Sequence, residues 1–311
     1  VYYTTSSTDA LINGKGYTTK LASSGNISFT GTINTSNVSI TPILGAASGD
    51  NYNLLGNPYT SYINSTTLIT AKPRDLEFTF WMWNGSTYDT KTTGVHPNFM
   101  IAPGQAFFIN AKTTSTIVFE ETIQSHNTTD TFQKSSRPEI IVNFSDDTNN
   151  RTTEIYYING TTKGFDNGYD GKMFGGTSNP FAIYSHLVSD SDGADYAIQS
   201  LPNSDYENMV IPIGVNAVSG KEVTFSAQAL NLPTGIKLFL EDKYTNTFTR
   251  LDEATSTYKV TLTEAINGIG RFYLHTKSSV LSTNEVNKEN ISIYKTNTTT
   301  LRIVGLSQGK S

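Results

Sequence analysis

Cysteine is absent from this sequence, and charged residues are scarce. Among 311 residues there is no cysteine, and Asp, Glu, Lys and Arg together make up 16% of the chain. The first absence excludes a disulfide scaffold and thiolate chemistry, but it does not identify the compartment, because many exported bacterial proteins also lack disulfides. No cluster of Lys and Arg accompanies the net charge of −5, so we expect no nucleic acid among the partners.

Long apolar runs are missing as well. No stretch approaches the ~20 apolar residues that a membrane helix needs. No signal peptide is visible, and the sequence opens on Val1-Tyr2-Tyr3 without a methionine. We therefore expect the chain to be a processed or trimmed part of a longer protein.

Aromatic and turn-forming residues are abundant. The 17 Tyr and 16 Phe residues suit pleated surfaces better than helices. Short alternating runs recur between Gly, Pro, Asn and Asp, for example at residues 27–33, 38–40, 116–119 and 237–240, whereas helical periodicity is almost missing. This pattern predicts an all-β fold of tandem antiparallel β-sandwich domains.

Polar segments divide the chain. One lies at residues 133–138 and a second at 278–289, where the sequence has the composition of a linker. We therefore expect a first β-sandwich at 1–133, a second at 134–277, and the first strands of a small third β-domain at 290–311. Two short strands alone cannot bury a core.

Two proline-containing motifs predict turns. In Gly56-Asn57-Pro58-Tyr59, the proline favours an extended Asn57, and Gly56 is free to adopt a positive φ. Pro103-Gly104 is typical of the centre of a type II turn, and an aromatic strand follows it.

The segment 78–83 places Trp81 and Trp83 on the same face of a predicted strand. Two interpretations stay open at this point. Either both faces of the strand are covered, or the two indoles form an exposed platform for stacking on sugar rings.

Acidic turns at 165–171 and 190–195 raise the question of calcium. Neither completes a ligand set: an EF-hand loop fails at the first, because Gly168 and Thr177 stand where ligands belong. Asx turns account for both segments. The four histidines show no zinc-binding spacing. We expect no metal, no cofactor and no catalytic centre, with an enzyme left only as a third alternative that would need carboxylates converging from distant positions.

A series of motifs in a fixed order carries a family resemblance. The motifs are Gly56-Asn57-Pro58-Tyr59, Pro103-Gly104-Gln105-Ala106-Phe107-Phe108, Phe165-Asp166-Asn167-Gly168-Tyr169-Asp170, Tyr196-Ala197-Ile198-Gln199, Ile211-Pro212-Ile213-Gly214, Leu240-Glu241-Asp242-Lys243 and Arg271-Phe272-Tyr273-Leu274. Together they resemble the C-terminal region of large surface proteins that Bacteroidetes export through the type IX secretion system. The resemblance covers most of the chain from about Gly16.

The last residues resemble the opening strands of a type A C-terminal sorting domain. The matching positions are Ile291, Ile293, Tyr294, Leu301 and Ile303. The family usually has Tyr-Pro-Asn-Pro after its first strand, whereas here Lys295-Thr296-Asn297 follows Tyr294, and the later strands of the domain lie beyond this sequence.

The resemblance implies a secreted cargo found outside the cell or attached to the outer-membrane surface. Its partners would be the secretion translocon and an outer-membrane shuttle barrel, and the sandwiches would serve as spacer or adhesive modules. The alternative is a carbohydrate-binding or adhesin module that uses Trp81 and Trp83, with a surface polysaccharide as partner.

Overall fold

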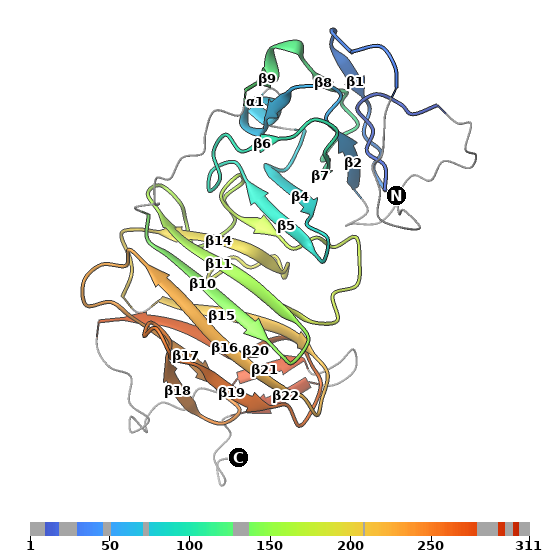
Figure 1. The fold of residues 1–311 in the computed structure, drawn as a ribbon. Coiled ribbons are helices and arrows are strands. Elements are labelled where there is room, and N and C mark those ends of the chain that lie inside the picture. Colours follow the sequence, from blue (N-terminus) through green and yellow to red (C-terminus); the bar gives the residue numbers. More distant parts are fainter. Residues whose placement is uncertain are drawn as a thin grey trace. The chain divides into compact units, whose positions relative to one another are not determined.

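The computed structural model describes residues 10–18, 30–45, 51–70, 75–126, 137–207, 209–278, 292–295 and 301–304. Strands dominate these ranges (Figure 1), and the only helices within them are the six-residue α1 (Ser65–Thr70) and the three-residue 3₁₀ helix η1 (Glu121–Ile123). The expected all-β fold class is confirmed. No helix among the described residues is long and apolar enough to cross a membrane.

The chain forms two compact units. Unit 1 comprises residues 1–133 together with Phe174–Gly176, and unit 2 comprises residues 134–173 and 177–311. The division after Gln133 lies in the polar segment identified in the sequence. The linker expected at 278–289 lies outside the described residues, apart from its first residue.

Unit 1 is built from three small sheets. The strand orders are β1–β8, β2–β7–β4–β5 and β6–β3–β9. The strands are β1 (Val38–Ile40), β2 (Tyr52–Gly56), β3 (Tyr62–Asn64), β4 (Thr79–Trp83), β5 (Tyr88–Thr92), β6 (Met100–Ile101), β7 (Ala106–Asn110), β8 (Ile117–Phe119) and β9 (Gln124–Ser125). One apolar core of aromatic and β-branched side chains draws on all three sheets. The strand expected at 27–33 is not formed in its described part, residues 30–33.

The two proline-containing motifs of unit 1 differ in backbone conformation at their glycines. The amide of Gln105 donates to the carbonyl of Ala102 at 3.1 Å and Gly104 has a φ of 70°, so the type II turn around Pro103-Gly104 is confirmed. Gly56 does not use the positive φ that a glycine permits. The space at this position is tight, because an added Cβ would lie 3.0 Å from the carbonyl oxygen of Lys15.

Unit 2 is dominated by one eleven-stranded sheet with the order β18–β17–β20–β15–β13–β14–β11–β10–β16–β19, and β12 pairs with β14. The strands are β10 (Glu139–Ser145), β11 (Asn150–Ile158), β12 (Gly171–Lys172), β13 (Ala182–Ser185), β14 (Tyr196–Pro202), β15 (Met209–Ala217), β16 (Glu222–Leu230), β17 (Lys237–Asp242), β18 (Thr247–Arg250), β19 (Tyr258–Thr261) and β20 (Ile266–Lys277). A separate hairpin consists of β21 (Ser292–Lys295) and β22 (Leu301–Val304).

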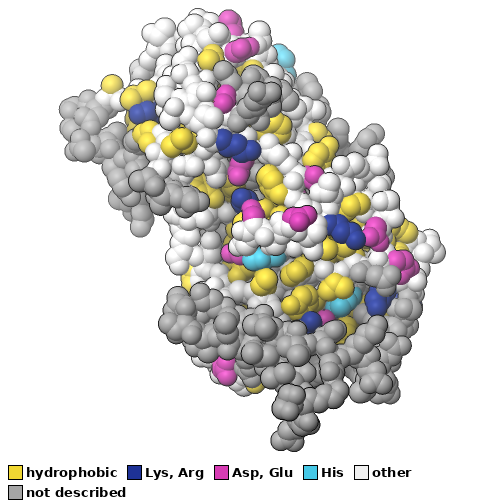
Figure 2. Space-filling view, turned by 180° about the vertical axis from the view of Figure 1, so that it is seen from behind, with side chains coloured by type: hydrophobic (Ala, Val, Ile, Leu, Met, Phe, Trp, Pro, Cys, Tyr) yellow, Lys and Arg dark blue, Asp and Glu magenta, His cyan; other side chains and the backbone are white. Residues whose placement is uncertain are grey.

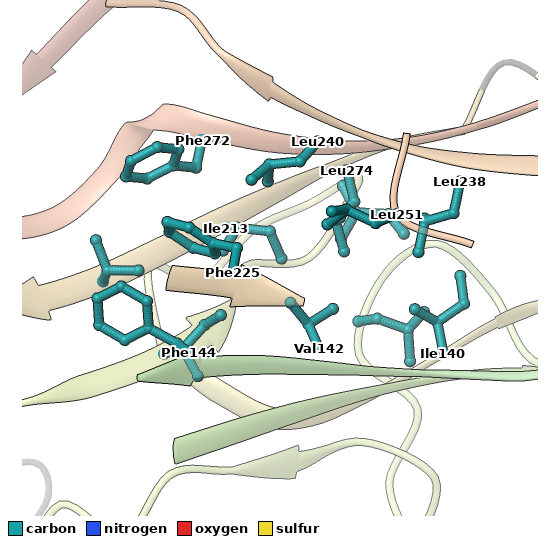
Figure 3. Close-up of a cluster of buried hydrophobic side chains, with 14 of the residues drawn as sticks. Ile140, Val142, Phe144, Ile213, Phe225, Leu238, Leu240, Leu251, Phe272 and Leu274 are labelled. Carbon is teal, nitrogen blue, oxygen red and sulfur yellow. The ribbon is translucent and has the colours of Figure 1, made fainter. Parts of the chain in front are cut away.

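The large sheet curls around its own core until it is nearly a closed barrel. Side chains of β10 point across the interior toward those of β17 and β20 (Figure 3), although these strands are far apart in the strand order. The rings of Phe225 on β16 and Phe272 on β20 lie 4.6 Å apart for the same reason. The alternating burial of β10, in which Ile140, Val142 and Phe144 face inward, is the period-two pattern of a strand with one face in the core. One continuous curled sheet therefore encloses the core that two separate layers would enclose in a β-sandwich.

Candidate functional site

The two tryptophans of β4 lie in different environments, so the paired-indole platform is not formed. Trp81 is fully buried, packed with Phe108 of β7 and with Phe174. Phe80 enters the main core on the opposite face of the strand, so both faces are covered at this point. The expectation that Trp81 contacts a ligand was therefore wrong. Trp83 is different, because 57% of its surface is exposed.

Trp83 sits at the rigid tip of the β4–β5 hairpin. The side-chain oxygen of Asn84 accepts the amides of Ser86 and Thr87, each at 2.9 Å, and Gly85 provides a φ of 101°. The ring of Tyr88 meets the indole edge-on, with centroids 5.1 Å apart. The hairpin therefore presents one indole in a fixed orientation.

The acidic turn at 165–171 uses its carboxylates to hold the chain together. Asp170 is buried, and its two oxygens accept the amides of Asp166 at 2.6 Å and Ser200 at 2.7 Å. The carboxylate of Asp166 accepts the amide and hydroxyl of Thr162. Burial raises the pKa of Asp170 to about 7, against the lowering effect of its two amide donors. The turn is thereby fixed onto β14.

The second acidic turn, at 190–195, is engaged in the same way. Asp192 accepts the amide of Ala194 at 3.0 Å and the ammonium of Lys172 at 3.1 Å. Burial acts to raise the pKa of Asp192, but these hydrogen bonds hold it below its usual value. Asp195 lies 2.9 Å from Nε2 of His186. Within the described part of the chain, no three His, Asp or Glu side chains gather in a way that could hold a metal ion.

A buried ion pair that the sequence did not reveal joins the neighbouring strands β17 and β20. Arg271 of β20 donates from Nε and Nη2 to the two oxygens of Asp242 on β17, at 2.9 and 2.7 Å. The hydroxyl of Tyr258 on β19 donates to the same carboxylate at 2.7 Å. Because β17 and β19 lie near opposite ends of the strand order, Asp242 joins the two ends of the sheet. A nearby second pair, His275 and Glu241, lies 2.8 Å apart.

The positions that resemble a sorting domain form part of a hairpin. Ile293 pairs with Ile303 and Lys295 with Leu301, while Tyr294 faces Arg302 in the register. Ile291 lies outside the described residues. Two strands are thus present where the sequence predicts them. Their recognition role stays a prediction.

Comparison with known proteins gives one family. The sequence model of a family described as a domain of unknown function (DUF8693) matches residues 84–276, from the β4–β5 turn to the last residues of β20. This is more than half of the chain, so the chain belongs to that family. No curated protein and no solved structure matches it.

Proposed function

We propose that this member of the DUF8693 family is a non-catalytic region of an exported cell-surface protein, in which the two β-units act as spacer or adhesive modules. The observation that carries the proposal is that three carboxylates of unit 2 are already hydrogen-bonded to other groups of the chain. Asp170, Asp192 and Asp242 each accept several hydrogen bonds from the backbone or from other side chains of the chain. These carboxylates fix turns and join strands, as expected of a load-transmitting module.

Export is the second part of the proposal. The resemblance of residues 290–311 to a sorting domain implies recognition by the type IX translocon and an outer-membrane shuttle barrel. The β21–β22 hairpin supports it, because a hairpin offers a strand edge of the kind that partner proteins bind. The strands of the large sheet end with β20, at Lys277, so the hairpin is not one of its members.

The test is to remove everything after Lys277 from the full-length protein in its native host. Secretion into the medium or onto the surface and the melting temperature of the purified chain are measured on the same variant. We expect secretion to be lost while the melting temperature falls by less than a few degrees. Normal secretion of the truncated protein would refute the export role. A matched variant, Ile303→Lys in the intact chain, separates recognition of the hairpin from mere chain length, and it should also reduce export.

Sugar binding at the β4–β5 hairpin is a second candidate, favoured by the exposed indole of Trp83. The indole of Trp83 contacts Tyr88 edge-on and leaves more than half of its surface exposed, which suits stacking on one sugar ring. Trp83→Ala should abolish binding of the chain to a surface polysaccharide, whereas Trp83→Phe should retain part of it. Equal binding by both variants and the parent chain would remove this candidate.

A further inference from the structure

A groove on the outer face of unit 2 is lined mostly by uncharged polar side chains. It has a volume of about 480 Å³, within the ~300–1,000 Å³ typical of small-molecule sites. Its floor is the outward face of the neighbouring strands β11, β10 and β16. In the register, Thr152, Asn143 and Ser226 form a row across these strands, and Gln228 lies in the next row beside Ile141.

The wall of the groove is the segment before β19, which is not paired with β16. Pairing between β16 and β19 ends at Phe225 and Tyr258. The preceding residues, Ala254 to Thr257, line the groove in place of continuing that ladder. Beyond Phe225, β16 is therefore paired with β10 on one side only and flanked by this connection. A second hollow of about 360 Å³ begins at Ala229, the next residue of β16 after the first groove.

The side chains of this groove are available to a ligand. No hydrogen bond within the described ranges engages the side chains of Thr152 and Gln228, and neither has a fixed partner. Asn143 reaches the hydroxyl of Ser226 only at 3.5 Å, which is longer than a good hydrogen bond. This contrasts with Asp170, Asp192 and Asp242, whose oxygens are occupied.

The lining selects among ligand classes by charge and polarity. It contains no Asp, Glu, Lys or Arg, so it offers nothing to neutralise a phosphate, a carboxylate or an ammonium group. On the face of the molecule that Figure 2 shows, Lys and Arg side chains are scattered, and several lie beside Asp or Glu. Amides and hydroxyls both donate and accept hydrogen bonds, as sugar hydroxyls do. An extended peptide would need apolar pockets for alternate side chains, and the floor supplies only Ile141 and an alanine.

We propose that this groove binds a neutral oligosaccharide, with Asn143, Thr152 and Gln228 as the hydrogen-bonding side chains. The inference rests on the adhesive part of the proposed function and names its ligand class. It places the ligand in unit 2, whereas Trp83 belongs to unit 1.

The experiment uses the whole 311-residue chain and defined tetra- to hexasaccharides of glucose, mannose, xylose and galactose, titrated by calorimetry. At least one neutral series should bind, and an oligosaccharide of uronic acids of the same length should not. Asn143→Ala and Gln228→Ala should each weaken binding about tenfold, as expected for the loss of one or two hydrogen bonds. Thr152→Tyr should block it by filling the groove from an exposed position.

One control makes the result decisive. Glu222→Ala alters an exposed residue of β16 outside the groove, so this variant should bind like the parent chain. The proposal is overturned if no neutral saccharide binds at millimolar concentration, if Thr152→Tyr leaves binding intact, or if a peptide library selects ligands at the groove instead. Secretion after truncation is measured separately, so failure here leaves the export proposal standing.

Discussion

Unit 1 and unit 2 bury similar side chains but hold their strands together by different means. The three sheets of unit 1 have at most four strands each, and polar side chains tie them together through backbone carbonyls. In unit 2, the strands form one eleven-stranded sheet, and the hydrogen bond from Tyr258 of β19 to Asp242 of β17 joins its two ends, beside the buried ion pair of Asp242 with Arg271. The two units thus differ in where their polar side chains act: at the contact between β17 and β19 in unit 2, and between the small sheets in unit 1.

The largest effect on stability should come from removing Arg271, the buried partner of Asp242. The side chains of Asp242 and Arg271 are almost completely buried, so Arg271→Ala leaves an unpaired carboxylate and should cost about 3–5 kcal/mol of stability. Urea unfolding followed by hydrogen exchange of β17 and β20 peptides would measure it. Lys259→Ala is the matched control, since its pair with Glu222 is 3.9 Å long and exposed and should contribute less than about 0.5 kcal/mol.

A double replacement sharpens this point. Asp242→Leu with Arg271→Met removes both charges, and it should recover most of the stability lost by Arg271→Ala, because well-packed apolar groups can replace a buried ion pair. If the double variant were as unstable as the single one, the cost would come from the hydroxyl of Tyr258, which loses its acceptor when Asp242 is replaced, and not from a buried unpaired charge.

The corresponding link in unit 1 is Asn57. Its amide group donates to the carbonyls of Ser61, Ile101 and Ala102, at 2.8, 3.1 and 3.1 Å, and its oxygen accepts the amide of Tyr59. Asn57→Ala should cost about 2–3 kcal/mol, because buried carbonyls lose their donor. Both tryptophans of the chain lie in unit 1, so the fluorescence transition reports this unit directly.

Asn57→Asp is the informative companion. It keeps the acceptor for Tyr59 but turns a carboxylate toward the same three carbonyls, so it should be at least as unstable as Asn57→Ala. Stability equal to that of the parent chain in either variant would show that the layers of unit 1 are held by their apolar core alone.

The sequence predicted the fold class and several turns, because both depend on neighbouring residues. Period-two alternation placed Phe80 and Trp81 on opposite faces of β4. It could not show that Phe174, far along the sequence, covers Trp81. The partnership of Asp242 and Arg271 was invisible for the same reason, although both residues lie in motifs that carried the family resemblance. The open side chains of Asn143 and Gln228 became visible only when three strands were placed side by side.

Gly214 in β15 offers a smaller test, of how tightly the large sheet is packed. An added Cβ would lie 2.0 Å from the buried ring of Tyr184, at the irregularity between Ile213 and Val215. Gly214→Ala should therefore cost about 1–3 kcal/mol through overpacking. Gly164→Ala is the control, because its nearest neighbour would be at an ordinary 3.7 Å. Equal melting temperatures for the two variants would mean that Tyr184 moves aside freely.

A further expected effect is a dependence of unit 2 on pH through Asp170. Burial raises the pKa of this carboxyl from the model-peptide value of 3.8 to about 7 in the folded chain. Since the folded pKa is the higher one, the contribution of Asp170 to stability is fully present below pH 4 and is lost as the pH rises through about 7. Asp170→Asn does not titrate at this position. Between pH 4.5 and pH 8, the urea midpoint of the parent chain should therefore fall relative to the midpoint of this variant. Asp170 belongs to unit 2, so the tryptophan fluorescence transition of unit 1 should show no matching difference between the two proteins. Parallel pH profiles in unit 2 would mean that the amides of Asp166 and Ser200 stabilise the carboxylate enough to cancel the effect of burial.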